Sequence, residues 1–291
     1  MTDWENLRHF LAVARIGTLS GAARVLQVDH ATVSRRLASL ESELQAVLVE
    51  RLPRACRLTP LGHQVFEKVQ AMEEGSYAIE RLLHATRAPL DGKVSLSAPP
   101  VLVTQLLAGR MAEFRRRHPG LQLAISAQGQ QVSLTRREAD VALRLVRPKD
   151  ASYVVRRIGR MHFGLYASRD YVHLQRPAEW EFIAFDTQFD EMPQQQWLLE
   201  LAEDRRVACR LSDISGHLAI ARAGAGVAGL PCFLGDADPG LQRLAPDGNK
   251  PFFRDIWLLV HRDLRRSAPV RAVMDFMAQI VTEQPALRLT S

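Results

Sequence analysis

A short run of small, polar and basic residues near the start of the chain has the composition of a nucleic-acid contact. A helix that enters the major groove needs small or polar side chains in its first turn, where it reaches the base edges. The free N–H groups of that turn also favour contact with phosphate. The sequence therefore predicts DNA contacts from Asp29, His30, Ala31, Thr32, Ser34, Arg35 and Arg36.

Within this run we expect His30, Thr32 and Arg35 to read base edges, and Ser34 and Arg36 to hold phosphate. A plainer interpretation is the solvated polar face of an ordinary helical cluster. Charge alone favours that interpretation, because residues 1–88 carry 11 basic and 10 acidic side chains and the whole chain has a net charge of +6. The DNA-binding hypothesis therefore depends on where the charges lie.

Three helices at the N-terminus are predicted to position this run. Apolar residues at helical spacing indicate a first helix over residues 3–15, which Gly17 ends. A short second helix follows Ser20, its candidate N-cap. Asp29 is the candidate N-cap of a third helix, whose expected buried stripe is Val33, Leu37, Leu40 and Leu44. Thr18 and Ser20, before the second helix, are further candidate DNA contacts.

Two short apolar runs after the third helix predict a β-hairpin with a basic tip, which we call the wing. The runs are Val47–Val49 and Arg57–Thr59. We expect the wing arginines to lie against the DNA backbone or the minor groove; they are Arg51, Arg54 and Arg57.

A long helix is predicted from Pro60, which follows the N-cap candidate Thr59. Its apolar positions step by four and three residues alternately, which is the spacing of a coiled-coil seam. A single amphipathic helix would also need this seam covered, and we interpret it as a self-association surface. The seam residues are Val65, Val69, Met72, Ile79 and Leu83, with Ser76 between them.

Composition excludes several classes of protein. The 291 residues are 47% hydrophobic and 24% charged, which is ordinary for a globular chain of about two domains. The longest uncharged stretch, residues 94–109, is too short to span a membrane, and charges near the N-terminus argue against a secretion signal. Three cysteines without metal-ligand spacing (Cys56, Cys209 and Cys232) fit a reducing cytoplasm, although a redox role for the last two stays open.

Beyond residues 88–92 the pattern changes to alternating strands and helices, which predicts an α/β domain of parallel sheets covered by helices on both faces. We therefore expect a DNA-binding domain at residues 1–59, a dimerisation helix at 60–88 and an α/β domain at 89–291. The expected strands are 94–97, 122–126, 141–145, 162–167, 182–185, 208–211, 227–230 and 256–261. The expected helices are 102–117, 195–202, 215–223 and 269–281.

One glycine motif in this part of the chain imitates a dinucleotide-binding loop. Residues 224–229 read Gly-Ala-Gly-Val-Ala-Gly, but a predicted helix precedes them and a strand follows, which reverses the order that such a loop requires. No nucleophile elbow, zinc-protease motif or phosphate loop is present. We expect no catalytic residues, no cofactor and no metal.

The N-terminal motifs resemble those of the LysR-type transcriptional regulators, a bacterial family. The resemblance rests on Phe10-Leu11-Ala12-Val13-Ala14, Gly17 to Ala23, Thr32 to Leu37, Leu48 to Arg51 and Arg57 to Gly62, and extends weakly over the remaining length. It implies a winged helix-turn-helix, a dimerising linker helix, and an effector domain of two subdomains shaped like periplasmic binding proteins. We expect these subdomains at about residues 92–161 plus 266–291, and at 162–265.

The chain departs from the family pattern in three places. His30-Ala31 stands where the family often has Gln-Pro, and Val49 replaces the usual Phe. Ala98-Pro99-Pro100 occupies the first effector loop, where a Ser or Thr hydroxyl is frequent. A carboxylate in this loop would therefore depend on backbone N–H groups.

The effector site is expected at the carboxyl ends of the parallel strands, where ligands of such sheets bind. An ordinary salt bridge is an alternative for Arg144, and a plain helix cap for Ser212 or Asp213. The candidate effector-binding residues are Ala98, Pro99, Pro100, Val101, Gln128, Gln130, Arg144, Ser212, Asp213 and Ser215.

Two functions stay open at this point. One is a transcriptional regulator that binds promoter DNA as a dimer or tetramer, responds to a small-molecule effector and contacts RNA polymerase if it activates, with no membrane partner. The other is an α/β binding protein or enzyme whose N-terminal helices serve only oligomerisation. Sequence-specific DNA binding that depends on Arg35 and Arg36 would separate them.

Overall fold

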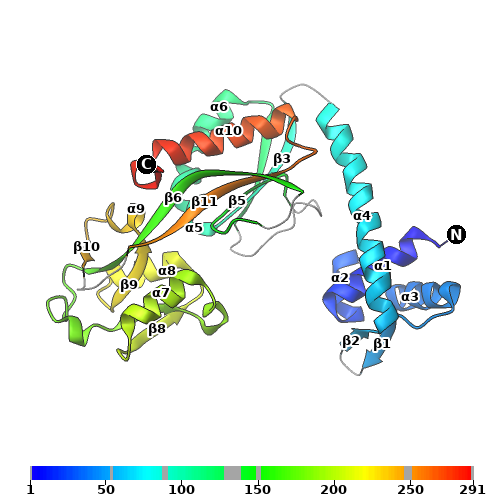
Figure 1. The fold of residues 1–291 in the computed structure, drawn as a ribbon, viewed down its shortest axis with the longest axis horizontal. Coiled ribbons are helices and arrows are strands. Elements are labelled where there is room, and N and C mark those ends of the chain that lie inside the picture. The colour runs from blue at the N-terminus through cyan, green and yellow to red at the C-terminus, as the bar shows by residue number, and fades with distance from the viewer. Residues whose placement is uncertain are drawn as a thin grey trace. The chain divides into compact units, whose positions relative to one another are not determined.

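The computed structural model describes residues 2–52, 55–86, 91–127, 139–148, 152–245 and 251–289, with the backbone alone at residues 78 and 80–86. The chain folds into two compact units, residues 1–81 and 82–291 (Figure 1). Each unit has its own hydrophobic core. None of the helices in the described part of the chain has the length and hydropathy needed to cross a bilayer.

The first unit contains the three predicted helices, each started by a side-chain cap. Asp3, Thr18 and Asp29 accept a hydrogen bond from the first turn of α1, α2 and α3 respectively. The prediction that Ser20 is the N-cap of the second helix is therefore wrong. The helices are α1 (Trp4–Ile16), α2 (Leu19–Leu26) and α3 (His30–Leu44).

The wing follows α3 as two paired antiparallel strands, β1 (Val49–Leu52) and β2 (Ala55–Leu58). Val33, Leu37 and Leu40 of the predicted stripe on α3 are fully buried in the core of the first unit, as expected. Leu44 is 38% exposed, so its predicted burial is wrong. Phe10 and Leu48 complete the centre of this core.

The long helix α4 (Pro60–Thr86) begins against the wing. The Thr59 hydroxyl accepts a hydrogen bond from the Gly62 N–H at 2.9 Å and donates to the Val47 carbonyl at 2.9 Å, which fixes the first turn. Gly62 lies so close to the wing that an added Cβ would stand 2.1 Å from the Leu48 carbonyl oxygen. The helix and the wing therefore form one rigid corner.

The predicted self-association seam on α4 divides into two parts. Val69 is 2% exposed and Val65 packs beside it, both in the core of the first unit. The burial of Val69 in its own chain contradicts its assignment to the dimer seam, whereas the seam role of the partly buried Val65 stays a prediction. Met72 and Ile79 are 52% and 63% exposed and remain available. The Leu83 side chain lies outside the described residues.

The second unit is built on one mixed sheet of nine described strands in the order β4-β3-β5-β11-β6-β9-β7-β8, with β10 paired to β6. Parallel pairing, as predicted, joins β3 to β4 and β5, and joins β7 to β8 and β9. The remaining pairs are antiparallel, so the expectation of purely parallel sheets is wrong. The strands are β3 (Gly92–Ala98), β4 (Leu121–Ala127), β5 (Val141–Arg144), β6 (Tyr153–Ser168), β7 (Phe182–Phe185), β8 (Val207–Leu211), β9 (Val227–Pro231), β10 (Leu241–Leu244) and β11 (Phe252–His261).

Two of these strands, β6 and β11, are long and connect the two ends of the sheet. They pair with each other along the whole length of β11, with a register shift between Ile256 and Trp257. One half of the pair contacts β5 through β11, and the other half contacts β9 through β6. The sequence predicted only the second half of β6 and of β11.

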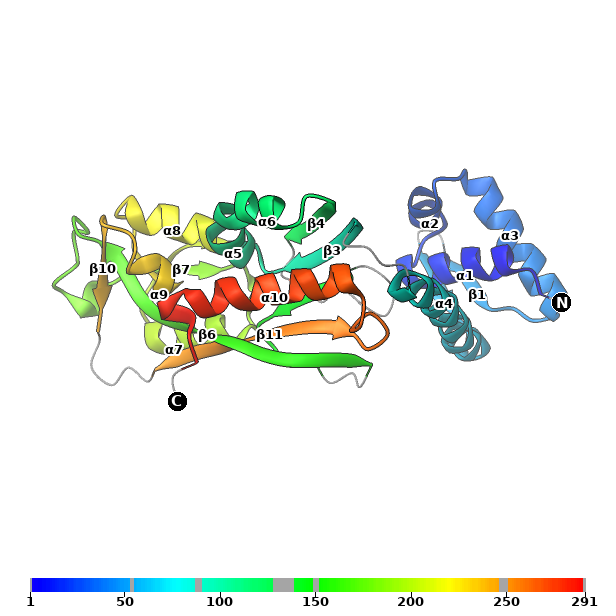
Figure 2. The same ribbon diagram turned by 90° about the horizontal axis from the view of Figure 1, so that it is seen from above.

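Helices cover the two ends of this sheet separately. Figures 1 and 2 show α6 and α10 beside the β3–β5 end, and α7, α8 and α9 beside the β7–β9 end. The predicted helix at 102–117 is interrupted by a π-helical turn (Val103–Leu107) and a 3-10 turn (Ala108–Arg110). The helices are α5 (Pro100–Leu102), α6 (Met111–Arg117), α7 (Pro193–Ala202), α8 (Ile214–Arg222), α9 (Cys232–Gly235) and α10 (Ala268–Glu283).

The glycine motif is a helix-to-strand turn, as predicted. Helix α8 precedes it and β9 follows. Gly226 adopts a φ of +155°, and a Cβ there would stand 2.7 Å from the Glu181 carbonyl oxygen. Its glycines therefore serve the tight turn and the close approach of two backbone segments.

Candidate functional site

The first turn of α3 is held by a cap formed between two predicted contact residues. Asp29 accepts a hydrogen bond from the Thr32 N–H at 2.6 Å and another from the Thr32 hydroxyl at 3.1 Å. These hydrogen bonds lower the pKa of the Asp29 carboxyl. Because the Thr32 hydroxyl donates to Asp29, Thr32 offers a base only its methyl group and an acceptor lone pair.

Three predicted contacts of α3 are exposed to solvent: His30, Ala31 and Arg35. Arg35 lies close enough to Asp29 for its charge to lower the pKa of that carboxyl further. The exposed start of α3 therefore carries an imidazole, a small apolar surface and a guanidinium group. This set can donate hydrogen bonds to base edges and contact a thymine methyl group.

Arg36 is tied to the first helix instead of standing free. Its Nη1 donates to Asp3 Oδ2 at 3.0 Å and to Asn6 Oδ1 at 3.3 Å. Asn6 is 2% exposed and donates to Glu43 at 2.9 Å. Arg36 therefore orients α3 on α1, and a phosphate contact by this residue has to compete with Asp3.

The wing is joined to α3 by one of its arginines. Arg51 Nη1 donates to the Ser34 hydroxyl at 3.1 Å, so these two predicted contacts lie together. Arg57 is exposed opposite Glu50 on the other strand of the wing. Arg54 lies outside the described residues.

Glu41 is a positioning residue that the sequence analysis missed. Its Oε1 accepts hydrogen bonds from the backbone N–H groups of Leu48 at 2.8 Å and Val49 at 3.0 Å, where the wing begins. An acidic residue one helical turn before the end of a predicted helix could have indicated such an anchor.

The two predicted DNA contacts at the start of α2 differ in role. Thr18 caps α2 by accepting a hydrogen bond from the Gly21 N–H at 3.1 Å, whereas Ser20 is exposed to solvent.

Replacing Glu41 tests this anchor. We expect Glu41→Ala to destabilise the wing by about 2–3 kcal/mol because two N–H groups lose their acceptor, and Glu41→Gln to cost less since its amide oxygen still accepts. Hydrogen exchange of the β1 amides measures the effect. Glu67→Ala, an exposed change on α4, is the matched control. Equal exchange in Glu41→Ala and the control would contradict the anchoring role.

The predicted effector residues occupy the carboxyl ends of several strands of the second unit. Ala98 and Val101 are 1% and 7% exposed, so a ligand could be contacted there only through their backbone groups, whereas Pro99 and Pro100 lie between them at intermediate exposure. Gln128 and Gln130 lie outside the described residues.

Three more predicted contacts lie at the N-terminus of α8: Ser212 and Asp213 precede the helix, and Ser215 lies in its first turn. Asp213 accepts hydrogen bonds from the N–H groups of Ser215 at 2.8 Å and Gly216 at 3.1 Å, which is the plain cap already considered. Ser212 and Ser215 have exposed side chains.

Arg144 ends β5 and makes no salt bridge with any described residue. Its Nη1 donates to the carbonyls of Ser97 at 3.0 Å and Leu143 at 2.7 Å, and its Nη2 donates to the Ser97 hydroxyl at 3.0 Å. Burial lowers the pKa of this guanidinium. The structure therefore does not support the salt-bridge alternative for Arg144 within the described part of the chain.

Two more polar residues near these strand ends were missed. Arg254 of β11 donates to the Leu145 carbonyl through Nε at 3.3 Å and Nη2 at 3.1 Å, and through Nη1 to Gln194 Oε1 of α7. His217 of α8 is fully buried against Phe185, with ring centroids 4.3 Å apart, and burial lowers its pKa. No sequence pattern indicated either one, because both positions depend on strand pairing.

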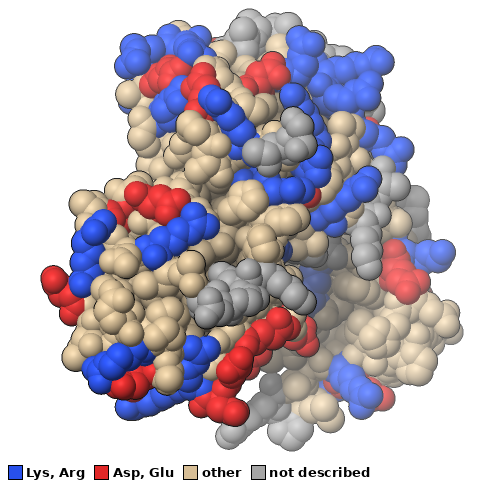
Figure 3. Space-filling view, turned by 60° about the vertical axis from the view of Figure 1, so that its left-hand side comes forward, with Lys and Arg blue, Asp and Glu red and all other residues tan. Residues whose placement is uncertain are grey.

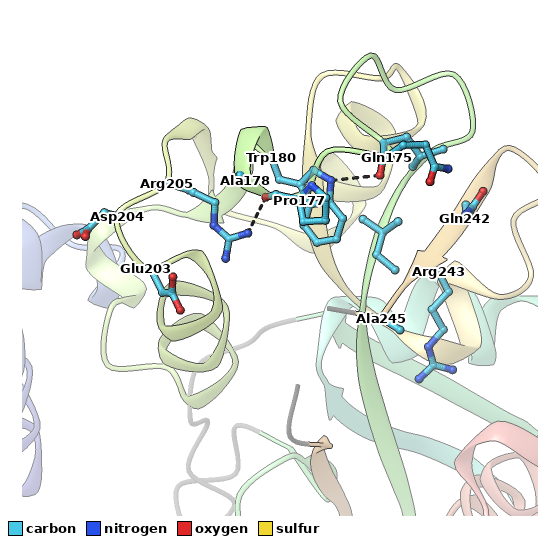
Figure 4. Close-up of a pocket in the computed structure, with 12 residues that line it drawn as sticks. Gln175, Pro177, Ala178, Trp180, Glu203, Asp204, Arg205, Gln242, Arg243 and Ala245 are labelled. Carbon is cyan, nitrogen blue, oxygen red and sulfur yellow. Dashed lines mark hydrogen bonds between the residues drawn. The ribbon is translucent and has the colours of Figure 1, made fainter. Parts of the chain in front are cut away.

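A hollow of about 700 Å³ in the second unit lies elsewhere (Figure 4). It is lined by residues 174–180, 203–205 and 242–245 and includes none of the predicted effector contacts. Trp180 Nε1 donates to the His173 carbonyl at 3.0 Å, and Arg205 Nη1 donates to the Pro177 carbonyl at 2.8 Å. Its lining includes two acidic and two basic residues, Glu203, Asp204, Arg205 and Arg243, so the hollow favours neither charge.

The described residues contain no group of three or more His, Cys, Asp or Glu side chains arranged to hold a metal ion. Cys56, Cys209 and Cys232 are free thiols. Burial raises the pKa of Cys209 and Cys232, which keeps both protonated and poorly nucleophilic.

A capped helix with an exposed polar start, set beside a basic wing, defines a winged helix-turn-helix DNA-binding protein. The first unit of this chain has that arrangement, and the second unit is a mixed α/β domain of the kind that binds small molecules at strand ends.

The chain belongs to the LysR family of bacterial transcriptional regulators. Residues 4–63 match the family model described as "Bacterial regulatory helix-turn-helix protein, lysR family", and residues 87–281 match the one described as "LysR substrate binding domain". The resemblance, the fold class and the function as a LysR-type regulator are thus confirmed, and the alternative of an enzyme is excluded.

Relatives of known name agree with this family assignment, and solved structures agree with the fold. The Mau operon transcriptional activator of Paracoccus denitrificans is 28% identical over 286 residues, 97% of each chain. The regulator CrgA of Neisseria meningitidis is 30% identical over 171 residues, 59% of this chain and 57% of CrgA. Full-length OxyR from Pseudomonas aeruginosa matches with a TM-score of 0.62 at 19% identity, covering 99% of this chain and 97% of OxyR. Full-length CbnR in complex with its target DNA matches with a TM-score of 0.57 at 20% identity, covering 95% and 99%.

Proposed function

We propose that this LysR-type regulator binds promoter DNA through the exposed start of α3 and the wing, and that a small molecule at the strand ends of the second unit alters that binding. The observation that carries the DNA-binding part is the joint placement of Arg35, His30 and Ala31 on the exposed first turns of a side-chain-capped helix. The Ser34–Arg51 hydrogen bond holds the wing beside that helix.

The roles of the individual residues follow from their contacts. His30 and Arg35 read base edges, with Thr32 contributing its methyl group or acceptor lone pair. Ser34 and the wing arginines hold phosphate, and Arg36 joins them only by leaving Asp3. The proposal also includes the domain boundaries: a DNA-binding domain at 1–59, a linker helix at 60–88 and an effector domain at 89–291. The two effector subdomains are placed at about 92–161 plus 266–291, and at 162–265.

The proposal also covers the oligomeric state of the regulator and its location in the cell. The regulator is a homodimer or a dimer of dimers, associated through the exposed part of the α4 seam. Effector binding shifts a pre-existing equilibrium between two arrangements of that assembly. The relative from Paracoccus denitrificans is named an activator, and activation here would act through contact with RNA polymerase. Because bacterial promoters lie in the cytoplasm, we place the protein there.

A footprinting titration on the DNA upstream of the protein's own gene tests the proposal. It compares the wild type with Arg35→Ala at two salt concentrations, against excess unrelated DNA. We expect a protected site in the wild type, and a loss of discrimination of about 1–3 kcal/mol at one base pair in Arg35→Ala because a bidentate base contact is removed. Arg8→Ala, an exposed change on α1, is the control.

Two outcomes would overturn parts of this proposal. Protection that is only salt-sensitive and equal on unrelated DNA would remove specific promoter binding. Full discrimination in Arg35→Ala would leave promoter binding intact and remove the assigned role of Arg35.

A further inference from the structure

One end of the second unit carries exposed basic side chains that pair with no described carboxylate. They come from the start of β3, from the end of α6, and from the loop and first turn that connect β11 to α10. None of these side chains makes an ion pair or a hydrogen bond with another described residue. We call this set the basic end; its members are Lys93, Arg115, Arg116, Arg262, Arg265, Arg266 and Arg271.

Strand pairing brings the start of β3 and the end of β11 to the same end of the sheet. Leu96 of β3 pairs with Val141 of β5, and Val141 pairs with Val260 of β11. Because β11 runs antiparallel to β5, Lys93, three residues before Leu96, lies level with the loop that follows β11. Neighbouring strands are about 4.8 Å apart, so β3 and β11, which flank β5, are separated by about 10 Å.

The end of α6 and the start of α10 lie side by side at this end. They border a hollow of about 320 Å³, lined by Arg117 and His118 on one side and by residues of α10 that include Arg271 on the other. Asp275 is the acidic residue of this lining. The arginines of α6 and of the α10 start therefore share one surface of the second unit.

Several arginines elsewhere in the second unit are paired with carboxylates. Arg160 donates to Asp255 at 2.8 Å, and Arg222 pairs with Asp238. Figure 3 shows basic side chains gathered over the upper part of the face that it draws, where Figure 1 has α6 and α10, and basic and acidic side chains interspersed below. The basic end is therefore distinguished by cations without described counter-charges.

A group of like charges calls for a partner of the opposite charge. Like charges that lie together repel one another and destabilise the folded chain, so seven unpaired cations at one end have no stabilising role. Six of the seven are arginines, whose planar guanidinium group matches phosphate with two parallel hydrogen bonds. A DNA duplex has one negative charge about every 1.7 Å along its axis, so a surface about 10 Å wide meets several phosphates.

DNA fits the basic end better than an acidic protein does. The chain belongs to a family of DNA-binding regulators, and β3, which begins at Gly92, is the first strand after the long helix α4. The two units are covalently connected at this end, so DNA held by the first unit is presented to the second at a raised effective concentration. An acidic protein would have to be recruited separately.

We propose that the basic end is a second DNA contact of this regulator, which binds the phosphate backbone of DNA already held by α3 and the wing. This contact reads no sequence, because phosphates carry none, and it adds affinity that decreases as salt increases. The inference rests on the proposed DNA binding by the first unit and goes beyond it, because it gives the effector domain a DNA contact of its own.

DNA titration of the full-length protein at several salt concentrations tests the proposal. The probes are the protected operator with about three helical turns of flanking DNA on each side, and unrelated DNA of the same length. The test variant combines Arg265→Gln, Arg266→Gln and Arg271→Gln. Each lost phosphate contact lowers the slope of log affinity against log salt concentration by about one. We therefore expect a slope smaller by about three for each bound copy, on both DNAs, with unchanged discrimination between them.

Two further variants separate a local contact from a general effect of charge. The matched control combines Arg169→Gln, Arg176→Gln and Arg206→Gln, which removes the same charge from exposed positions elsewhere in the second unit and should keep the wild-type slope. Lysine at positions 265, 266 and 271 keeps the charge that attracts phosphate and should retain most of the affinity. Thermal unfolding of each variant checks that it is folded.

Three results would overturn the proposal: a slope in the test variant equal to that of the wild type, an equal decrease in the matched control, or a lysine variant as weak as the glutamine one. An unchanged slope would leave an acidic protein as the partner of the basic end. Failure of specific promoter binding appears differently, as equal affinity of the wild type for both DNAs, and the comparison of slopes on unrelated DNA still applies in that case. The two failures are therefore distinguishable.

Discussion

Gly62→Ala is expected to destabilise the first unit by about 3 kcal/mol, the upper range for a forced backbone shift. The new methyl group would stand 2.1 Å from the Leu48 carbonyl oxygen, which belongs to the backbone and cannot rotate away. Relief requires α4 and the wing to separate, and the hydrogen bonds of Thr59 that join them would be lost.

Hydrogen exchange of the wing amides and operator affinity measure this effect together. We expect faster exchange at β1 and β2, weaker DNA binding, and unchanged exchange in the second unit. Gly75→Ala is the matched control, because it lies in the same helix with nothing within 4 Å of an added Cβ. It should stabilise α4 by up to about 1 kcal/mol. Equal behaviour of the two variants would show that the corner tolerates a side chain.

Ile79→Asp is expected to disrupt self-association and to lower operator affinity by about 100-fold or more. Ile79 is 63% exposed on α4, which places a large apolar side chain in water unless another copy covers it. A dimer that holds two half-sites gains from effective concentration, by about 10²–10⁴-fold, and a monomer loses that gain.

Sedimentation measures the oligomeric state of this variant, and DNA titration measures its operator affinity. The control is Ala71→Asp, which adds the same charge to an exposed position of α4 away from the seam. We expect a monomer for Ile79→Asp and an unchanged assembly for the control. A variant that remains fully associated would mean that the exposed part of the seam is not the interface.

The helices and the wing of the first unit could be predicted because each depends on residues that are close together in the sequence. Asp29 caps α3 as expected, and the stripe of Val33, Leu37 and Leu40 is buried. The N-cap of α2 was misplaced because Thr18 and Ser20 have similar capping chemistry, and only the backbone conformation decides between them. The spacing of Val65 and Val69 fits a partner in the same chain as well as one in another chain.

The surroundings of the candidate effector residues were harder to predict because strand pairing between distant parts of the sequence creates them. Arg254 contacts Leu145, which lies 109 residues earlier in the chain. A charged residue in an apolar strand gives no indication of which strand it will meet. The strand β10 was missed because Gln242 and Arg243 interrupt its apolar pattern, and the first halves of β6 and β11 were missed because charged residues weaken theirs.

The continuous pairing of β6 with β11 restricts how the two ends of the sheet can move. Sliding one strand by a single residue would turn every side chain of that strand to the opposite face, so Ile256 and Leu258 would leave the core. A twist of the pair keeps this register, and the regular pairing is already interrupted between Ile256 and Trp257. A ligand that bound at the end of β5 would therefore act on the far end of the sheet by twisting the β6–β11 pair.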